Sequence, residues 1–392
     1  MNILHKTLIL TLCLAAHSGS LAQEGQDPAA NLTLEDLRTF TEVFNQVRSH
    51  YVEEIDERAL LRAAIEGMVV RLDPWSEFMD AEQFRNFDNS SEGRYGGIGV
   101  RVEVRERRIF IEAVLPDSPA EQAGILAGDM LLAIDGRGVR GRRLNESVDA
   151  LLGEPGTEIS LRLQTPGQAA RELALERAYV PVPSVYRKLV DQDVGTFHIS
   201  HFTRHSHEEL REGIDDLQKT LGRPLAGIIL DLRGNPGGVV SPAVEIADGF
   251  LDQGLIVYTR SRYAPSRIEI SARQGQWTAE TPLVVLVDEQ TASAAEVLAG
   301  ALQDNDRATI IGSQTFGKGS IQSVLALRNG SALKLTTARY FTPSGRVIED
   351  QGIEPDLILP PAPASDQADP SPELEPGIKA ALRAIRGLRD DS

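Results

Sequence analysis

The sequence predicts an α/β core with a parallel-rich sheet and added β-hairpins, an inserted β-rich domain, and an N-terminal helical region. Two observations support this fold class. Between residues 179 and 360, apolar runs such as GIILDL and LVVLVD alternate with amphipathic segments such as SHEELREGIDDLQKTL. Strands and helices that alternate in this way form βαβ units around a mostly parallel sheet. Residues 93–178 instead contain short β patterns separated by turns, which is typical of a small barrel or sandwich.

Residues 1–22 have the pattern of a secretory signal peptide. MNILHK carries one lysine, TLILTLCLAA is apolar, and Ser20-Leu21-Ala22 offers a small-x-small cleavage site. No later apolar run approaches 18 residues, so no transmembrane span is expected in the mature chain. The one cysteine, Cys13, lies in this segment, which excludes disulfides and cysteine nucleophiles from the mature chain. Export without disulfides suits a bacterial periplasm.

Residues 23–92 are expected to form the helical region. The segment Thr33-Leu34-Glu35-Asp36 resembles a capping box, and apolar residues follow it at helical spacing. A second helix is expected from about Glu57 to Val70, and LDPWSEFM ends it. Two amphipathic helices this short need a partner surface. Trp75 and Phe78 are interpreted as core or helix-packing residues.

Further elements follow from local patterns in the rest of the chain. In residues 93–178, strands are expected at GIGVRVEV, RIFIEAV, MLLAIDG and EISLRLQ, with helices at SPAEQAG and LNESVDALLG. In residues 179–360, SPAVEIADGFL and SAAEVLAGALQD are further helices, and VGTFHISHF and RATIIG are further strands. Residues 361–392 are expected to be a proline-rich linker and a last short helix, IKAALRAIRGL.

The composition excludes some partners. The chain has 392 residues, with 41% hydrophobic and 25% charged, which is ordinary for a globular protein of two or three domains. Its formal net charge of −17 repels nucleic acid and anionic lipid surfaces, so no nucleic-acid partner is expected.

The segment GSQTFGKGSIQ, residues 312–322, is one residue short of a phosphate-binding P-loop. Such a loop needs Ser or Thr straight after its lysine, and a helix behind it whose N-terminus binds the phosphate. Here Gly319 follows Lys318, and the residues beyond contain β-branched side chains and the turn Asn329-Gly330. This pattern predicts a β-hairpin and argues against a nucleotide site.

Ser293 is the candidate nucleophile. It follows LVVLVD at a strand-to-helix turn, among alanines that would leave its hydroxyl accessible, although serine is also a common helix N-cap. A serine hydroxyl needs a base, and none of the seven histidines lies in a small-residue turn. Lys318, between two glycines, can serve as that base if burial keeps it neutral. Gln322 could orient the amine without adding a negative charge that would raise the pKa of Lys318.

An oxyanion hole is the remaining requirement of such a site. The segment DLRGNPGG, residues 231–238, follows the strand GIIL, and Gly237 and Gly238 can present backbone N–H groups to a substrate. The amide of Ala294 is the natural second donor. Both loops follow the carboxyl ends of buried strands, where open α/β sheets place their sites.

The motifs DLRGNPGG, TASAAE, FGKGSIQ, LTTARYFTPSGRVI and GIEPD, in this order, closely resemble the carboxyl-terminal processing, or tail-specific, proteases. The resemblance covers residues 39–359. It implies a serine endopeptidase that forms an acyl-enzyme and needs no cofactor. It assigns the nucleophile to Ser293, the general base to Lys318 and the orienting residue to Gln322. It also implies an oxyanion hole at Gly237 or Gly238.

In that family YGGIGV opens an inserted PDZ domain, which implies recognition of protein C-termini. Gly96, Gly97, Ile98 and Gly99 would hold the terminal carboxylate, with Ile98 lining a pocket for an apolar last residue. The implied partners are proteins with apolar C-termini, an adaptor protein, and a second copy of the chain at the N-terminal helices. The alternative for these helices is packing against the chain's own core. The implied location is the periplasm, with peripheral membrane association as a variant.

The sequence differs from the family pattern at two positions, and two alternative interpretations are weighed against the protease assignment. Trp75 stands where members usually have histidine, and Leu152 where many carry an arginine that takes part in PDZ gating. The four histidines between residues 198 and 207 are interpreted as surface or core residues, and no metal is expected. The alternative function is a PDZ-bearing binding or scaffold protein with a vestigial protease fold. The intact site residues argue against it.

Overall fold

The computed structural model describes residues 32–141, 143–262, 267–278, 281–359 and 375–390. The signal peptide expected at residues 1–22 lies outside the described residues, as does nearly all of the expected proline-rich linker. The chain divides into two compact units, residues 1–64 and 65–392. No helix in the described part is long and apolar enough to cross a membrane.

The first unit contains α1 (Leu34–His50) and the start of α2 (Glu57–Val70). The expected capping box is confirmed, since the Thr33 N–H donates to the Asp36 carboxylate at 2.8 Å and Asp36 N–H donates to Thr33 Oγ1 at 3.2 Å. Helix α1 buries none of its residues. Leu34, Phe40 and Val43 on this helix are at least 50% exposed, so its apolar face has no partner among the residues of this unit that the structure describes.

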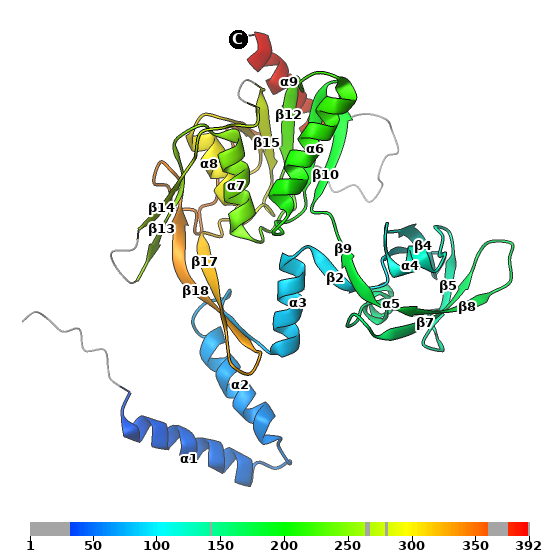
Figure 1. Ribbon diagram of the computed structural model, residues 1–392. Helices are drawn as coiled ribbons and strands as arrows, with labels where there is room; N and C mark the ends of the chain where they lie inside the picture. Colours follow the sequence, from blue (N-terminus) through cyan, green and yellow to red (C-terminus); the bar gives the residue numbers. More distant parts are fainter. Residues whose placement is uncertain (1–31, 142, 263–266, 279–280, 360–374, 391–392) are drawn as a thin grey trace, which may run out of the picture. The chain divides into compact units, whose positions relative to one another are not determined.

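The predicted parallel sheet is confirmed in the second unit (Figure 1). Its strand order is β10-β11-β12-β15-β16-β19, and every neighbouring pair is parallel except β10 with β11. The two central strands, β12 and β15, are buried throughout, as their apolar runs predict. The strands are β10 (Val185–Val190), β11 (Val194–Ile199), β12 (Gly227–Asp231), β15 (Leu283–Val287), β16 (Thr309–Gly312) and β19 (Leu357–Ile358).

Helices cover both faces of this sheet. Alternate residues of β12 point to opposite sides, so Ile228 packs with the core under α6, α7 and α8, while Ile229 packs with α9. Helix α9 fits closely, because a Cβ at Gly227 would lie 2.6 Å from the Ile385 side chain. The helices are α6 (Ser206–Leu221), α7 (Val240–Phe250), α8 (Ala294–Asp304) and α9 (Pro376–Asp390).

A second, antiparallel sheet stands beside the first (Figure 1). Its order is β1-β18-β13-β14, with β17 paired to β18. The expected hairpin is confirmed, because β17 and β18 pair antiparallel on either side of Asn329-Gly330, with Gly330 at φ 83°. The strands are β1 (Glu77–Met79), β13 (Leu255–Ser261), β14 (Ile268–Ser271), β17 (Ser320–Ala326) and β18 (Ala332–Phe341).

The end of the expected helical region departs from the sequence prediction. Residues 77–79 form β1, which pairs with β18, and α3 (Ala81–Ser91) follows it. Asp80 begins α3 with a capping box to Gln83 that the sequence interpretation missed. Residues 65–92 belong to the same compact unit as the parallel and antiparallel sheets. The other predicted domain boundaries stay predictions.

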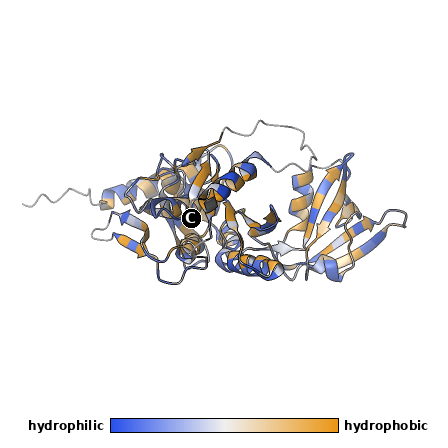
Figure 2. Cartoon of the chain, turned by 90° about the horizontal axis from the view of Figure 1, so that it is seen from above, coloured by the Kyte–Doolittle hydropathy of each residue, from blue (hydrophilic) through white to orange (hydrophobic). Residues whose placement is uncertain are grey.

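Residues 94–181 form the inserted β-rich domain. Its entry strand β2 pairs with its exit strand β9, and its main sheet has the order β3-β4-β5-β7-β8, with β6 on β5. Several of its strands alternate apolar and polar residues (Figure 2), as β7 does with Ile159, Leu161 and Leu163 buried, whereas β5 is a continuous apolar run. The strands are β2 (Arg94–Gly97), β3 (Val100–Arg105), β4 (Arg108–Val114), β5 (Met130–Ile134), β6 (Arg137–Gly138), β7 (Glu158–Gln164), β8 (Arg171–Glu176) and β9 (Ala178–Pro181), with helices α4 (Pro119–Gln122) and α5 (Leu144–Leu151).

A pair of leucines on α9 tests whether this helix is part of the core. Leu382 is 5% exposed and Leu388 is 43% exposed on the same helix. We expect Leu382→Ala to lower the free energy of unfolding by about 2–5 kcal/mol, because it removes buried methyl groups and leaves a cavity. Leu388→Ala should change it by less than about 0.5 kcal/mol. Chemical denaturation followed by circular dichroism measures both, and equal effects would contradict the docking of α9.

Candidate active site

Four of the candidate site residues line one cavity of about 680 Å³ in the second unit. Ser293, Lys318, Gln322 and Gly238 all contribute to its wall. They come from the turn before α8, the loop before β17, strand β17 itself, and the loop after β12. Apolar side chains complete the wall, among them Phe84, Phe87, Ile321 and Val324. The cavity thus combines a set of polar groups with an apolar surface, as substrate sites commonly do.

Ser293 occupies the N-cap position of α8 in an unusual backbone conformation, with φ 57° and ψ −117°. A positive φ is rare for a residue with a side chain and costs about 1–3 kcal/mol, which the surrounding structure must hold in place. Ser293 is 9% exposed, and the strand before it and the helix after it are buried. The sharp turn therefore carries its hydroxyl to the cavity wall.

The buried carboxylate of Glu296 connects this turn to the lysine loop, and the sequence interpretation missed it. Its Oε2 accepts from Ser293 N–H at 2.8 Å and from Lys318 N–H at 2.9 Å. Its Oε1 accepts from Gly317 N–H at 2.7 Å and from Thr315 Oγ1 at 2.5 Å. The signal for it was present as the capping-box spacing of serine and glutamate at 293 and 296.

Only an ionised carboxylate accepts hydrogen bonds at both oxygens without donating one. Burial raises the pKa of Glu296 above its ordinary value, while the hydrogen bonds from Thr315, Gly317, Lys318 and Ser293 act to lower it. The side chain is 0% exposed, so its charge is stabilised by these four donors rather than by water.

Lys318 lies in a loop that packs as closely as its glycines predict. A Cβ at Gly319 would lie 2.3 Å from the backbone nitrogen of Glu349, so only glycine fits there. Burial lowers the pKa of Lys318, and the nearby cation of Lys334 lowers it further, against the opposing effects of Glu349, Glu77 and Asp73. This direction is the one a neutral general base requires.

The amine of Lys318 rests on an aromatic ring in this conformation. Its Nζ lies 4.2 Å from the centroid of the Trp75 ring. No hydrogen bond joins Nζ to Ser293 Oγ or to Gln322 among the residues that the structure describes. The sequence interpretation of Trp75 as a core or helix-packing residue did not foresee this contact, since the indole is half-buried and packs against the candidate base and Phe316. The sequence could not reveal this contact, which depends on β1 pairing with β18.

Gln322 lies in β17, and two hydrogen bonds from its side-chain amide nitrogen fix its orientation. Its Nε2 donates to Ser320 Oγ at 3.1 Å and to Thr336 Oγ1 at 3.2 Å. This leaves its amide oxygen as the acceptor that could face an amine.

The loop after β12 approaches Ser293 closely. A Cβ at Gly237 would lie 2.7 Å from Ser293 Cβ, and a Cβ at Gly238 would lie 2.2 Å from Phe202 O, so both positions require glycine. Gly237 N–H donates to the buried Asn235 Oδ1 at 2.8 Å, which engages it. Of the two expected donors in this loop, Gly238 is thus the better candidate. Ala294, the other candidate donor, begins α8, where N–H groups have no partner within the helix.

The four residues expected to hold a carboxylate in the inserted domain have different surroundings. Gly96 and Gly97 pair with Tyr179 and Ala178 in the β2–β9 ladder. The side chain of Ile98 is 1% exposed and belongs to the domain's core, so it does not form an open pocket wall. Gly99 lies at the turn into β3 with φ 83°. Strand β3 lies at the edge of its sheet and, among the described strands, pairs only with β4, which is the position where a peptide strand can add.

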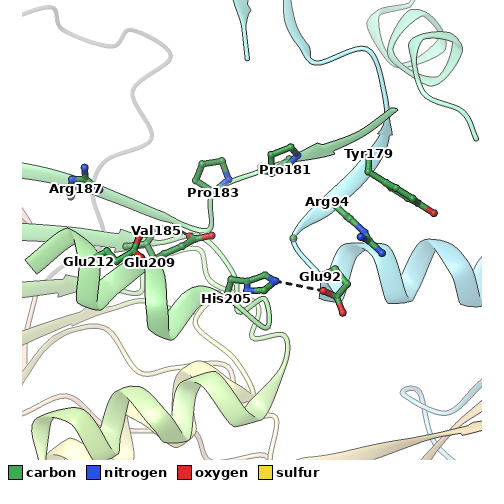
Figure 3. Close-up of a pocket in the computed structure, with 12 residues that line it drawn as sticks. Glu92, Arg94, Tyr179, Pro181, Pro183, Val185, Arg187, His205, Glu209 and Glu212 are labelled. Atoms are coloured by element: carbon green, nitrogen blue, oxygen red, sulfur yellow. Dashed lines mark hydrogen bonds and ion pairs between the residues drawn. The ribbon is translucent and has the colours of Figure 1, made fainter. Parts of the chain in front are cut away.

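A second cavity, of about 580 Å³, lies where the inserted domain joins the core (Figure 3). His205 Nε2 lies 3.6 Å from Glu92 Oε2 in this cavity, and Arg94 stacks on the Tyr179 ring. Its lining includes no serine, lysine or cysteine, so it does not contain the Ser-Lys pair that the sequence predicts. Among the described residues no cluster of three or more histidine, cysteine or acidic side chains could hold a metal ion.

Family models match three parts of the chain. Peptidase family S41 matches residues 193–359, and a PDZ domain model matches residues 110–165. The model for the activating protease CtpB N-terminal domain matches residues 11–83. The first match includes the loops of Ser293, Lys318 and Gly238.

Several known proteins are similar over most of their length. The carboxy-terminal-processing protease of Bartonella bacilliformis is 41% identical over 330 residues, which cover 83% of this chain and 76% of that protein. The carboxy-terminal processing protease CtpA of Bacillus subtilis is 33% identical over 387 residues, covering 97% of this chain and 81% of that protein. A solved photosystem II D1 C-terminal processing protease is 31% identical, with a TM-score of 0.48, and the match covers 84% of this chain and 94% of that one.

Replacing one oxygen of the Glu296 carboxylate tests the connection between the two loops. Glu296→Gln puts an amide donor where two N–H groups now donate, so we expect the free energy of unfolding to fall by about 2–4 kcal/mol. The matched control is Glu245→Gln on the neighbouring helix α7, whose side chain is exposed and should tolerate the change. Chemical denaturation measures both variants. If the two substitutions had the same small effect, Glu296 would not hold the loops together.

Proposed function

The chain belongs to the carboxy-terminal processing proteases of peptidase family S41, and on this premise we propose how it cleaves its substrates. Ser293 is the nucleophile, Lys318 the general base and Gln322 the residue that orients the lysine. The observation that carries the proposal is the Glu296 carboxylate, which joins the Ser293 turn to the Lys318 loop beside one cavity. A Ser-Lys pair performs the same chemistry as a serine and histidine.

In the first step neutral Lys318 Nζ takes the proton from Ser293 Oγ while Oγ bonds to the carbonyl carbon of the scissile peptide. The π electrons of that carbonyl move to its oxygen, and the N–H groups of Gly238 and Ala294 stabilise the resulting oxyanion. Losing one such donor typically costs a factor of about 10²–10³ in rate. The burial that lowers the pKa of Lys318 supports this step, because it makes the neutral amine more abundant near neutral pH.

In the second step the oxyanion collapses and the carbon–nitrogen bond breaks. The Lys318 ammonium donates its proton to the leaving amine, and an ester between the substrate and Ser293 Oγ remains. Water then attacks this ester with Lys318 as the base. The acid product leaves and Ser293 Oγ regains its proton. Before the first step the lysine must leave Trp75 and reach Ser293, with the amide oxygen of Gln322 as its new partner.

The inserted PDZ domain is proposed to select substrates by their C-termini. A peptide adds as a strand along the free edge of β3, and its carboxylate binds backbone N–H groups at the turn of Ile98 and Gly99. The side chains of β3 that face α5 would receive an apolar last residue. Proteins with apolar C-termini are the substrates this arrangement favours.

The remaining functional expectations concern place and partners. We propose that residues 1–22 direct export to the periplasm, where the chain acts on other exported proteins. The apolar face of α1, with Leu34, Phe40 and Val43 exposed, supports association with a second copy of the chain. An adaptor protein and peripheral membrane association stay predictions from the family resemblance.

The pH dependence of serine modification tests the assigned base. We expect a serine-directed phosphonate to label Ser293 at a rate that rises with pH through the lowered pKa of Lys318, since only the neutral amine can take the proton. Lys318→Ala should lose the labelling, and Ser293→Ala should lose both labelling and peptide cleavage. Mass spectrometry of the labelled chain identifies the residue. A flat rate between about pH 5 and 9, or unchanged labelling in Lys318→Ala, would favour a scaffold protein with a vestigial site.

A pair of peptides tests C-terminal recognition. The full chain carrying Ser293→Ala should bind a peptide with a free apolar C-terminus at least about 10-fold more tightly than its C-terminal amide, because the amide loses charge-assisted hydrogen bonds. A peptide that differs only in a terminal aspartate is the control for the apolar position. Calorimetry gives the affinities, and equal binding of acid and amide would reject recognition through the carboxylate.

A further inference from the structure

We propose that Trp75 is a positioning residue that holds the Lys318 ammonium away from Ser293 in the resting enzyme. Because this inference rests on the proposed role of Lys318 as the base, its test includes a measurement that does not depend on catalysis. The lysine has two competing partners. One is the indole face of Trp75, which it contacts, and the other is the hydroxyl of Ser293, which it must reach to act.

The contact between Lys318 and the Trp75 ring favours the protonated form of the amine. The Lys318 Nζ lies 4.2 Å from the Trp75 ring centroid, well within the range of about 6 Å over which a cation is attracted to an aromatic face. Tryptophan is the most effective side chain for this interaction, and partial burial strengthens it. Both side chains are half-buried. A neutral amine lacks the charge that the ring attracts, so Trp75 selectively holds the inactive, protonated base.

The indole is itself held firmly in place. Asp73 Oδ1 accepts from the N–H groups of Trp75 and Ser76, both at 2.8 Å, and forms a tight turn. Ser76 Oγ in turn accepts from Thr336 N–H at 3.0 Å, which ties the turn to β18. The Phe316 ring meets the indole edge-on, with centroids 6.1 Å apart. The ring therefore has a fixed place beside the lysine loop.

Strand β18 also forms a hydrogen bond to Gln322, the residue on β17 that should orient the lysine. Thr336 Oγ1, on β18, accepts from Gln322 Nε2 at 3.2 Å. Gln322 is thus ready beside the cavity while the amine lies on Trp75. Activation therefore requires Lys318 Nζ to lose its proton and its side chain to turn from Trp75 towards Ser293. The backbone of the loop does not need to refold.

The charged groups around Lys318 define how pH acts on this equilibrium. Lys334 on β18 disfavours the ammonium, whereas Glu77 on β1, Asp73 in the turn before it, and Glu349 beyond β18 favour it. The contact with Trp75 acts in the same direction as these three carboxylates, because it also stabilises the ammonium form of Lys318. Removing the indole should therefore move the activity midpoint of the enzyme to lower pH, and the variant and the wild type should converge at high pH, where the amine is neutral in both.

Substitution of Trp75 tests the proposal through kinetics. Below the activity midpoint, Trp75→Leu should raise the rate of Ser293 labelling by a phosphonate about 2- to 30-fold, the range that a cation–π contact corresponds to. Trp75→Phe, with a weaker aromatic face, should lie between Trp75→Leu and wild type, and it serves as the test if the leucine variant does not fold. A rate that is unchanged or lower in folded variants would overturn the proposal.

Fluorescence tests the contact without any catalysis. The chain has two tryptophans, and the second, Trp277, packs against Phe250 and His207. In the full chain carrying Trp277→Phe, Trp75 emission should change as Lys318 loses its proton, and Lys318→Met should abolish that change. Emission that titrates identically with and without Lys318 would reject the contact. If the emission behaves as expected but the wild type is never labelled at Ser293, the proposed catalytic function fails while the contact stands.

Discussion

The four hydrogen bonds accepted by the Glu296 carboxylate connect two loops that follow different strands of the central sheet. One loop carries the strained turn of Ser293 and the other carries Lys318. A buried charge is costly unless its hydrogen-bonding capacity is satisfied, so this carboxylate strongly favours the one arrangement in which all four donors converge. The unusual backbone of Ser293 is then a consequence of that arrangement, because the turn that strains it also aims its N–H at Glu296.

Each of the two sheets positions a different part of the candidate site. The parallel sheet brings the loops after β12 and β15 to one edge, which supplies Gly238, Ser293 and the start of α8. The antiparallel sheet supplies what the first cannot, since β17 carries Gln322 and begins just after Lys318, and β1 sets Trp75 beside it. The Glu296 carboxylate links them, because it accepts hydrogen bonds both from the Ser293 turn and from the loop that leads into β17. A change in the pairing of β1 with β18 would therefore reach the lysine without touching the nucleophile.

The sequence predicted the parts of this structure that depend on local patterns. Apolar runs such as LVVLVD become buried strands, and Asn329-Gly330 closes the hairpin that rules out a P-loop. The catalytic assignments came from motif order and remain proposals, although their loops do converge on one cavity. What could not be predicted depends on contacts between distant segments. The short β1 has too few residues to show a period, and the meeting of Trp75 with Lys318 follows from its pairing. Glu296 had a visible capping signal, but its bonds to Thr315 and Gly317 require the folded loop.

A crystal structure of the chain with a peptide boronate bonded to Ser293 would test the account most directly. The boronate is tetrahedral and carries an oxygen where the oxyanion would lie. We expect Lys318 Nζ to have left the Trp75 ring and to lie within about 3.2 Å of Ser293 Oγ, with the Glu296 hydrogen bonds to both loops unchanged. Finding the adduct formed while Nζ still rests on the indole, or finding the two loops separated from Glu296, would contradict it.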